Sequence, residues 1–399
     1  MAVTNICLLG STGSIGTSTL DVVSRHPDHF KIHSLVAGTN ANLLAHQISQ
    51  FRPQLVVVAT DPVRARLMEV LTKLGLQRND LPQIEVGPEA RVSAATDPSV
   101  GFVMSAIVGV AGLEATYEAV RLGKRVGLAN KEVLVASGKL VTEAARASNT
   151  EMIPVDSEHN GAHQCLRAGL RKEVSKLILT ASGGPFRETP TELLETVTPQ
   201  EALNHPTWKM GQRITIDCAT LMNKGFEVIE ACWLFDFASH EVEVVVHPQS
   251  TVHAMVEFTD GSVMAQVSAT DMRMPIQYAL TYPDRWEAPV PRLDWKQTRL
   301  WNFYPPDLEK FRLLKLAYEA FDTGGTATCT LNAADEIAVE AFLREEITFP
   351  GIAAVVEDTL NAVPSRNAGT VGEVLATDLE SRAAAQRMVQ RRSRKLVGA

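Results

Sequence analysis

The sequence predicts an α/β fold in three parts: an N-terminal doubly wound parallel sheet, a central α+β domain and a C-terminal helical domain. Over roughly the first 150 residues, short apolar runs alternate with amphipathic helical stretches, which is the pattern of parallel βαβ units with right-handed crossovers. Strand patterns follow, and helical spacing returns beyond Phe311. We therefore expect domains at 1–155, 156–285 and 312–399, with a linker at 286–311.

The strands expected in the first domain are short and apolar, and helical stretches separate most of them. They are Ile6–Leu9, Ile32–Ala37, Leu55–Ala59, Phe102–Val108, Val126–Ala129 and Met152–Val155, with helices at Leu113–Leu122 and Glu132–Ala147 among others. In such sheets ligands bind at the carboxyl ends of the strands. Gly10, Gly38, Asn130 and Asp156 are therefore expected along one edge of the sheet.

The central domain contains three more strand candidates, at Val242–Val246, Thr251–Phe258 and Ser262–Val267. They resemble a meander in which Asp260-Gly261 forms the last hairpin turn. The next segment contains four prolines and little periodicity, which is typical of a linker. Apolar residues at helical spacing between Leu313 and Phe342 then predict the small helical domain.

Bulk properties exclude several classes of protein. A chain of 399 residues with 45% hydrophobic and 21% charged residues is typical of a globular protein with two or three domains. A net charge of −8 without a basic stripe argues against nucleic-acid binding, and no apolar run approaches the ~20 residues of a membrane span. Five scattered cysteines without a Cys-x-x-Cys pair, and a first strand with no signal peptide before it, favour a cytoplasmic protein.

Glycines at 10, 13 and 16 lie between an apolar strand and a helical stretch that starts near Thr19. Glycine permits the tight turn, and backbone N–H groups at the helix N-terminus can then hold a pyrophosphate. The context predicts a Rossmann-like dinucleotide site, and the alternative is a sharp turn with no ligand. At the end of the second strand, Ala37-Gly-Thr-Asn40 has no carboxylate for a ribose 2′-hydroxyl, so NADP is favoured over NAD.

Three carboxylates are candidates for a shared metal: Asp156, Glu158 and Glu227. In an extended chain the first two project to the same side, and oxygen ligands suit Mg²⁺ or Mn²⁺. The alternative is that these acids cap helices or meet solvent. His159 and His163 have the i, i+4 spacing of a helical zinc pair, but without the intervening glutamate of H-E-x-x-H we expect them to pack or to support the metal ligands.

Two turns of the central region suit a phosphate monoester. Ser182-Gly-Gly184 offers a hydroxyl and a flexible backbone, and Asn223-Lys-Gly225 adds an amide and a cation. The segment His205–Gly211 has a proline and a glycine around Trp208 and Met210, which predicts a lid that excludes water. The alternative is a surface loop with a buried tryptophan.

Together these motifs resemble the 1-deoxy-D-xylulose 5-phosphate reductoisomerase family over nearly the whole chain. The pieces that carry the resemblance are Gly-Ser-Thr-Gly-Ser-Ile-Gly (10–16), Leu-Ala-Asn-Lys-Glu (128–132), Val-Asp-Ser-Glu-His-Asn (155–160), Ser-Gly-Gly-Pro-Phe-Arg-Glu (182–188), Met-Asn-Lys-Gly (222–225), His-Pro-Gln-Ser (247–250) and Leu-Asn-Ala-Ala (331–334). The resemblance implies NADPH- and divalent-metal-dependent isomerisation and reduction of 1-deoxy-D-xylulose 5-phosphate to 2-C-methyl-D-erythritol 4-phosphate, in the methylerythritol phosphate route to isoprenoids.

The resemblance also implies roles for individual residues. NADPH would be bound by Thr12, Gly13, Ser14, Ile15, Gly38, Thr39, Asn40, Asn130, Glu132, Met210 and Gly211. The substrate would be bound by Lys131, Ser157, Glu158, Ser182, His205, Trp208, Cys218, Asn223, Lys224 and Glu227. Among these Lys131, Glu158, His205 and Glu227 would be catalytic, and Asp156, Glu158 and Glu227 would hold Mg²⁺, Mn²⁺ or Co²⁺.

Two positions depart from the family's pattern. Cys218 stands where a serine commonly contacts the phosphate, and a thiol is a poorer donor. Thr39 occupies a place where a basic residue near the cofactor phosphate is common. The resemblance further implies a homodimer built through the central domain. Two other functions stay open, an NADP-dependent semialdehyde or sugar-phosphate dehydrogenase without isomerisation and a non-catalytic NADP-binding sensor.

Overall fold

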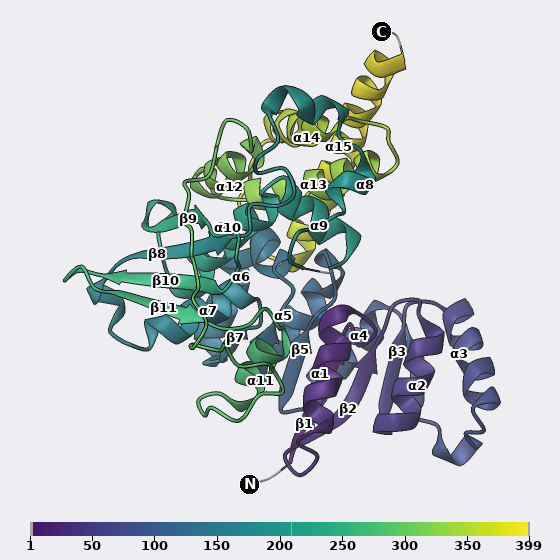
Figure 1. Cartoon of the computed structure of the whole chain (residues 1–399). Coiled ribbons are helices and arrows are strands. Elements are labelled where there is room, and N and C mark those ends of the chain that lie inside the picture. The colour runs from purple at the N-terminus through teal and green to yellow at the C-terminus, as the bar shows by residue number, and fades with distance from the viewer. Residues whose placement is uncertain (1–2, 209, 398–399) are drawn as a thin grey trace. The chain divides into compact units, whose positions relative to one another are not determined.

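The computed structural model describes residues 3–208 and 210–397, and the chain forms two compact units. Unit 1 comprises Met1–Val133, Val141–Asn160 and Asp271–Pro291. Unit 2 comprises Leu134–Leu140, Gly161–Thr270 and Arg292–Ala399. Figure 1 shows the helices and strands of the whole chain, and each unit is described here by itself.

Unit 1 contains a seven-stranded sheet in the order β4-β3-β2-β1-β5-β6-β7, with every neighbouring pair parallel. Its strands are β1 (Thr4–Leu9), β2 (Phe30–Val36), β3 (Leu55–Val58), β4 (Gln83–Val86), β5 (Phe102–Ser105), β6 (Arg125–Leu128) and β7 (Met152–Pro154). The predicted doubly wound sheet is confirmed. Strand β4 is not among the predicted strands, because this edge strand reads Gln-Ile-Glu-Val, is not fully buried and so lacks an apolar run.

Helices of unit 1 connect these strands and bury one face against the sheet. They include α1 (Ser14–Ser24), α2 (Ala41–Phe51), α3 (Asp61–Lys73), α4 (Pro88–Thr96), α5 (Leu113–Arg121) and α11 (Arg273–Thr281). Two further helices, α6 (Glu132–Ser148) and α7 (Ser157–Leu166), have residues in both units. Apolar side chains such as Leu8, Leu35 and Leu44 are fully buried in the core, where each contributes about 1.5–3 kcal/mol.

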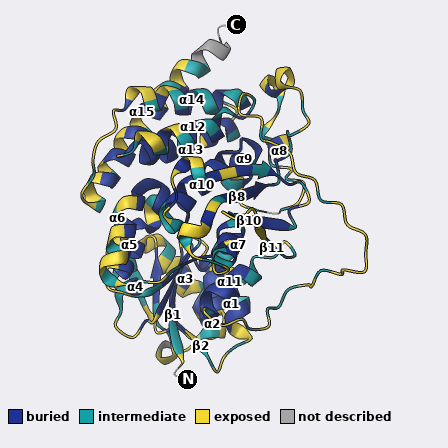
Figure 2. Ribbon diagram, turned by 90° about the vertical axis from the view of Figure 1, so that its left-hand side faces the viewer, coloured by how far each residue is buried: buried dark blue, intermediate teal, exposed yellow. Residues whose placement is uncertain are grey.

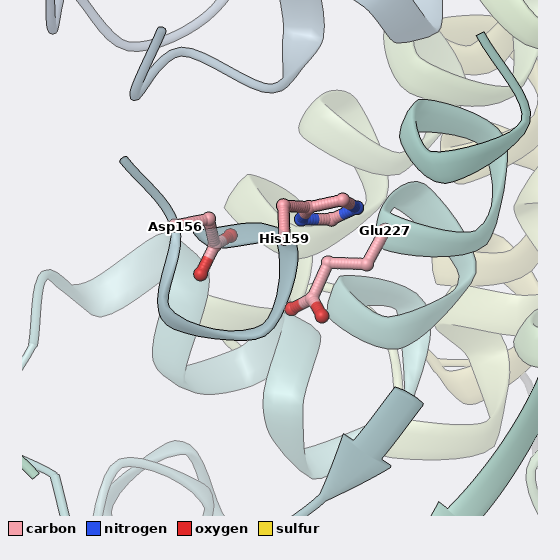
Figure 3. A group of neighbouring side chains, drawn as sticks. All are labelled: Asp156, His159 and Glu227. Atoms are coloured by element: carbon pink, nitrogen blue, oxygen red, sulfur yellow. The ribbon is translucent and has the colours of Figure 1, made fainter. Parts of the chain in front are cut away.

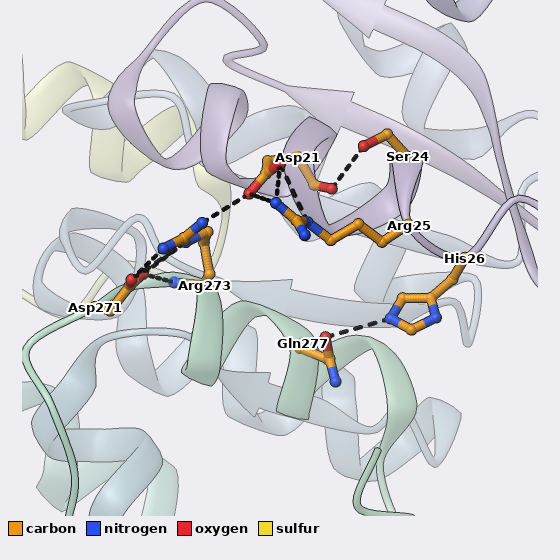
Figure 4. Close-up of polar contacts among 7 residues, drawn as sticks. All are labelled: Asp21, Ser24, Arg25, His26, Asp271, Arg273 and Gln277. Carbon is orange, nitrogen blue, oxygen red and sulfur yellow. Dashed lines mark hydrogen bonds and ion pairs between the residues drawn. The ribbon is translucent and has the colours of Figure 1, made fainter. Parts of the chain in front are cut away.

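Helix α11 is held against α1 by charged and polar side chains (Figure 4). Arg273 binds Asp271 at 2.6 Å and Asp21 of α1 at 3.1 Å, although 252 residues separate Arg273 from Asp21. The imidazole of His26 contacts the side-chain amide of Gln277 at 3.3 Å. These contacts fix the helix that begins at the glycine-rich turn.

Unit 2 contains a four-stranded sheet in the order β11-β10-β8-β9. Its strands are β8 (Val174–Ala181), β9 (Val242–Val246), β10 (Val252–Phe258) and β11 (Val263–Val267). The hairpin between β10 and β11 turns at Gly261 as predicted, with φ +85°. The predicted meander is wrong at its first step, because β8 lies between β9 and β10, parallel to one and antiparallel to the other. Strand β8 is not among the predicted strands, and its mostly buried side chains suit this inner position.

The helices of unit 2 pack into a second core, and the predicted helical C-terminal region is confirmed. They are α8 (Pro199–Ala202), α9 (Gln212–Ala219), α10 (Met222–Phe235), α12 (Arg312–Thr323), α13 (Ala327–Leu343), α14 (Phe349–Ala362) and α15 (Val371–Val397). In Figure 2, exposed and buried segments alternate along α15, as expected for a helix with one buried face. Among the described helices, none combines the length and apolar character needed to cross a bilayer.

The segment predicted as a linker, 286–311, contains neither a helix nor a strand among the described residues, apart from a bridge between Tyr304 and Val246. The grouping of 271–291 with unit 1 follows from α11, which contacts α1, β6 and β7. The four-part division made from the sequence stays a prediction.

We predict that Gly10→Ala lowers the free energy of unfolding by roughly 2–4 kcal/mol, since Gly10 has φ +90° and an added Cβ would lie 2.3 Å from the carbonyl oxygen of Ala106. Gly75→Ala is the matched control, because Gly75 has φ +78° but no atom within 4 Å of the added Cβ. Urea unfolding of both variants measures the difference. Equal losses would show that the close approach to Ala106 contributes nothing.

Candidate active site

The glycine-rich turn after β1 has the geometry of a dinucleotide-binding turn. The amides of Gly10 and Ser11 both donate to the carbonyl of Val36 at 2.9 Å, which joins the turn to the end of β2. A Cβ at Gly16 would lie 2.3 Å from the carbonyl oxygen of Gly10, so only glycine fits there. Gly13 is the N-cap of α1 and is exposed, and no side chain caps this helix. The first-turn amides can therefore bind an anionic group.

The other residues predicted to bind NADPH near the first two strands follow the ends of β1 and β2. Thr12 and Ile15 are half-buried and Ser14 is exposed in the same turn. Gly38, Thr39 and Asn40 are exposed directly after β2, and the Asn40 side chain accepts a hydrogen bond from the amide of Leu43 at 3.1 Å. Asn40 therefore caps α2, a role that sequence reasoning did not assign.

Three buried polar residues follow the end of β6: Asn130, Lys131 and Glu132. The Asn130 side chain donates to the carbonyl of Gly109 at 3.0 Å and so holds the loop that follows β5. The ammonium of Lys131 lies 2.5 Å from a carboxylate oxygen of Asp156 at the end of β7. Gly10, Gly38, Asn130 and Asp156 all follow carboxyl ends of parallel strands in one sheet, as predicted.

The backbone expected at Asp156 and Glu158 is wrong. The chain is helical from Ser157, and the carbonyl of Asp156 accepts the amide of Asn160 at 2.8 Å. Residues at positions i and i+2 of a helix are about 200° apart around its axis, so the spacing of Asp156 and Glu158 does not place both carboxylates on one side. The hydroxyl of Ser157 donates to Glu158 at 2.5 Å.

A group of potential metal ligands is formed by Asp156, His159 and Glu227, and Figure 3 shows the three side chains. One ligand atom from each lies within 4.8 Å of the other two. Two carboxylates and an imidazole suit a divalent cation such as Mn²⁺ or Mg²⁺. Glu158 is not a member of this group, and its predicted role as a ligand stays a prediction. The i, i+3 spacing of Asp156 and His159 is the helical signal that could have found His159.

In unit 2, Ser182-Gly-Gly184 has an irregular backbone after β8, as expected of a turn, whereas the turn expected at Asn223-Lys-Gly225 is wrong, because α10 already begins at Met222. Gly183 and Gly184 have φ of +85° and +64°. A Cβ at Gly184 would lie 2.7 Å from the carbonyl oxygen of Cys218 and 3.0 Å from the Cα of Ala219. Both glycines are therefore required by the turn, and its backbone contacts the end of α9.

His205 orients the hydroxyl of Ser182. The Nδ1 atom of His205 accepts hydrogen bonds from the amides of Trp208 at 2.9 Å and Thr207 at 3.2 Å, so the proton of the neutral ring is on Nε2. Nε2 lies 3.0 Å from Ser182 Oγ, which also accepts the amide of Gly184 at 3.3 Å. Burial lowers the pKa of His205, which favours this neutral form. The Ser182 proton is then available for an acceptor such as a phosphate oxygen.

Helix α10 begins with the other polar residues of the predicted substrate site. The Asn223 amide donates to one Glu227 oxygen at 2.6 Å, and Lys224 pairs with the other oxygen at 2.5 Å. Lys224 and Glu227 are both buried, so each offsets the cost of desolvating the other.

The predicted lid has neither helix nor strand among its described residues and leads into α9, whose N-cap is Gly211. Trp208 and Met210 are half-buried and Gly211 is exposed. Lys209 lies outside the described residues. The role of the segment His205–Gly211 as a lid stays a prediction.

Three family models match the chain. Residues 6–138 match 1-deoxy-D-xylulose 5-phosphate reductoisomerase, residues 152–235 match the C-terminal domain of 1-deoxy-D-xylulose 5-phosphate reductoisomerase, and residues 267–384 match the DXP reductoisomerase C-terminal domain. The reductoisomerase of Solibacter usitatus is 65% identical over 97% of this chain and 98% of its own length. That of Chloroherpeton thalassium is 48% identical over 94% of this chain and 96% of its own length.

Solved structures agree with these matches. The Zymomonas mobilis reductoisomerase in complex with NADPH has a TM-score of 0.90 and 41% identity, covering 97% of this chain and 99% of that one. A DOX-P reductoisomerase in complex with NADPH, fosmidomycin and magnesium has a TM-score of 0.91 and 40% identity, covering 97% of this chain and 98% of that one.

We predict that His163 makes folding stability depend on pH. Burial, with a smaller effect of Arg167, lowers the pKa of His163 to about 4, so the unfolded chain binds a proton there that the folded chain does not. This contribution is present above pH 6.5 and is lost as the pH falls towards 4, by up to about 2 kcal/mol at pH 5. Urea unfolding of His163→Gln at pH 8 and pH 5 should show a smaller pH dependence than the wild type. An unchanged dependence would contradict a buried neutral ring.

Proposed function

This chain belongs to the 1-deoxy-D-xylulose 5-phosphate reductoisomerase family, and we propose which residues carry out the NADPH- and divalent-metal-dependent conversion of that substrate to 2-C-methyl-D-erythritol 4-phosphate. This oxidoreductase reaction belongs to isoprenoid biosynthesis. The observation that supports this function most directly is the 65% identity with the Solibacter usitatus reductoisomerase over 97% of this chain. The roles of single residues rest on the geometry described above.

NADPH supplies the hydride that reduces the rearranged substrate. We propose that the amides of Ser14 and Ile15 bind its pyrophosphate, because they begin α1 without a side-chain cap, and that Gly13 contacts NADPH beside them. The remaining cofactor contacts are proposed for the residues that follow neighbouring strands and for the end of the lid: Thr12, Gly38, Thr39, Asn40, Asn130, Glu132, Met210 and Gly211.

A divalent cation, when bound, polarises the substrate carbonyl and holds the neighbouring hydroxyl. We propose that Asp156, Glu158 and Glu227 hold it, with His159 beside them. The gathering of Asp156, His159 and Glu227 supports this position. Lys131 and Lys224 each pair with one of the carboxylates and keep it charged and oriented for the metal.

Ser182, Asn223 and Lys224 are proposed to bind the substrate phosphate, and Ser157 to contact the substrate near the metal. The hydroxyl of Ser182 is held by His205 with its proton free to donate, and Lys224 supplies positive charge. Cys218 lies against the same turn, and its thiol gives a weaker contact than a hydroxyl. Trp208 would cover the carbon chain and exclude water when the lid closes.

Proton transfers during the rearrangement are proposed for Lys131, Glu158 and Glu227. Cleavage and re-joining of a carbon–carbon bond requires a hydroxyl to lose a proton and a carbonyl oxygen to gain one. Two distances support this proposal: the Lys131 ammonium lies 2.5 Å from Asp156, and a ligand atom of Glu227 lies within 4.8 Å of one of Asp156. His205 orients Ser182 and so holds the phosphate end of the substrate in place.

We propose that the protein is a cytoplasmic homodimer that uses the edge of the unit 2 sheet. The five free cysteines fit a reducing compartment. Strand β11 is an edge strand, and its Val263 and Met264 are 47% and 45% exposed. Edge strands that expose apolar side chains pair readily with a second chain.

The dimer is tested by sedimentation velocity of the wild type and of the double variant Val263→Lys, Met264→Lys. The wild type is expected as a dimer and the variant as a monomer, because two lysines facing their copies repel each other. A monomeric wild type would contradict the proposal.

We predict that Glu227→Gln lowers kcat at least about 10²-fold, because the metal loses a charged ligand, and leaves NADPH affinity within about twofold. NADPH oxidation with 1-deoxy-D-xylulose 5-phosphate measures kcat, and cofactor fluorescence measures affinity. Glu243→Gln, at an exposed position of β9, is the control for the substitution itself. Wild-type turnover in Glu227→Gln would remove this residue from the metal site, and wild-type activity that survives EDTA would favour a dehydrogenase without isomerisation.

A further inference from the structure

Helices α9 and α13 meet at a line of charged and polar side chains, which we call the α9–α13 seam: Arg213, Asp217, Asn332, Asp335 and Glu336. The Arg213 guanidinium donates to Glu336 at 2.7 Å and to Asn332 at 2.9 Å. It also lies 3.6 Å from Asp335 and 3.7 Å from Asp217. One arginine of α9 therefore binds side chains from three positions of a helix more than a hundred residues away.

Asp335 is the most buried member of the seam, with 0% of its side chain exposed. Neither of its carboxylate oxygens accepts a hydrogen bond among the described residues. Burial raises the pKa of Asp335 well above its usual range, and the neighbouring charge of Asp217 raises it further. A proton on Asp335 that is donated to Asp217 removes one buried charge and pairs both carboxyl groups.

The seam continues from α13 to α15. Arg382 binds the second oxygen of Glu336 and donates to Asp378 at 2.6 Å. Glu336 thus joins one arginine from α9 and one from α15. Apolar contacts around the seam, such as those of Ile216 and Leu331, are not directional, whereas the forked guanidinium fits one arrangement of its partners.

The position of α9 also determines the geometry of the proposed substrate site. Cys218 follows Asp217 directly, and the Cys218 carbonyl lies against Gly184 of the Ser182 turn. The lid ends at Gly211, two residues before Arg213. A rotation or slide of α9 would therefore move one wall of the proposed phosphate site and the end of the lid together.

We propose that Arg213 and Asp217 are positioning residues, which hold α9 against Asp335 and Glu336 of α13 and so keep the phosphate-binding turn in place. This inference rests on the proposed phosphate site. In this proposal Arg213 and Asp217 act through the position of α9 and not on the substrate itself. The C-terminal helices thereby set the geometry of a site to which they give no side chain.

The first test compares Arg213→Met with Arg382→Met, since each removes one arginine partner of Glu336. Both should lower the thermal midpoint, but only Arg213→Met should lower kcat/KM for 1-deoxy-D-xylulose 5-phosphate, by about 10²-fold, as expected for a misplacement of about 1 Å. NADPH affinity should stay within about threefold, and Arg213→Lys should recover part of the loss because it keeps the charge. Equal kcat/KM in the two methionine variants would overturn the positioning role.

The second test addresses the shared proton. Asp335→Asn should keep kcat/KM within about twofold, because an amide replaces a protonated carboxyl group and can donate to Asp217 in the same way. Asp335→Ala should lower kcat/KM, since it leaves Asp217 without that donor. A loss in Asp335→Asn as large as in Asp335→Ala would overturn the protonated state. If the wild type fails to convert the substrate at all, the proposed function fails and not the seam alone.

Discussion

The pairing of a buried or half-buried carboxylate with a buried lysine is the interaction on which the site depends. It occurs twice, between Lys131 and Asp156 in unit 1 and between Lys224 and Glu227 in unit 2. An isolated buried carboxylate would take up a proton and lose its value as a metal ligand. Each lysine removes that cost and leaves an ionised oxygen donor. Both pairs lie where an element ends or begins, so the fold places them by its strand and helix boundaries.

In each unit, a different set of contacts fixes the ends of the strands and helices that position these residues. In unit 1 the parallel strands end at one edge of the sheet, and Arg273 fixes α1 from a segment that is remote in sequence. In unit 2 the Gly183-Gly184 turn packs against the end of α9, and α9 is tied to α13 by Arg213. The chemistry needs few side chains, and much of the chain serves to keep them in place.

The sequence predicted the parts of this arrangement that depend on local pattern. The strand predicted at Ile32–Ala37 overlaps β2 (Phe30–Val36) because of its apolar run, and the hairpin turn at Gly261 follows from glycine. Strand β4 has no apolar run, and the place of β8 between β9 and β10 depends on pairing that no local pattern encodes.

Within the site, prediction failed where a backbone state or a remote partner decides the geometry. The sequence predicts Asp156 and Glu158 on an extended chain, but the helix starts at Ser157 and brings His159 toward Asp156. Arg213 belongs to none of the sequence motifs, and its partners on α13 are 119 and 123 residues away, so local sequence does not indicate its role. Such contacts become visible only when the chain is folded.

The most direct measurement of the central claim is anomalous scattering from crystals of the protein grown with Mn²⁺. The account predicts one strong peak within coordination distance of carboxylate oxygens from both Asp156 and Glu227, with Lys131 and Lys224 still beside them. A peak bound by only one of these two carboxylates, or bound elsewhere in the molecule, would contradict it.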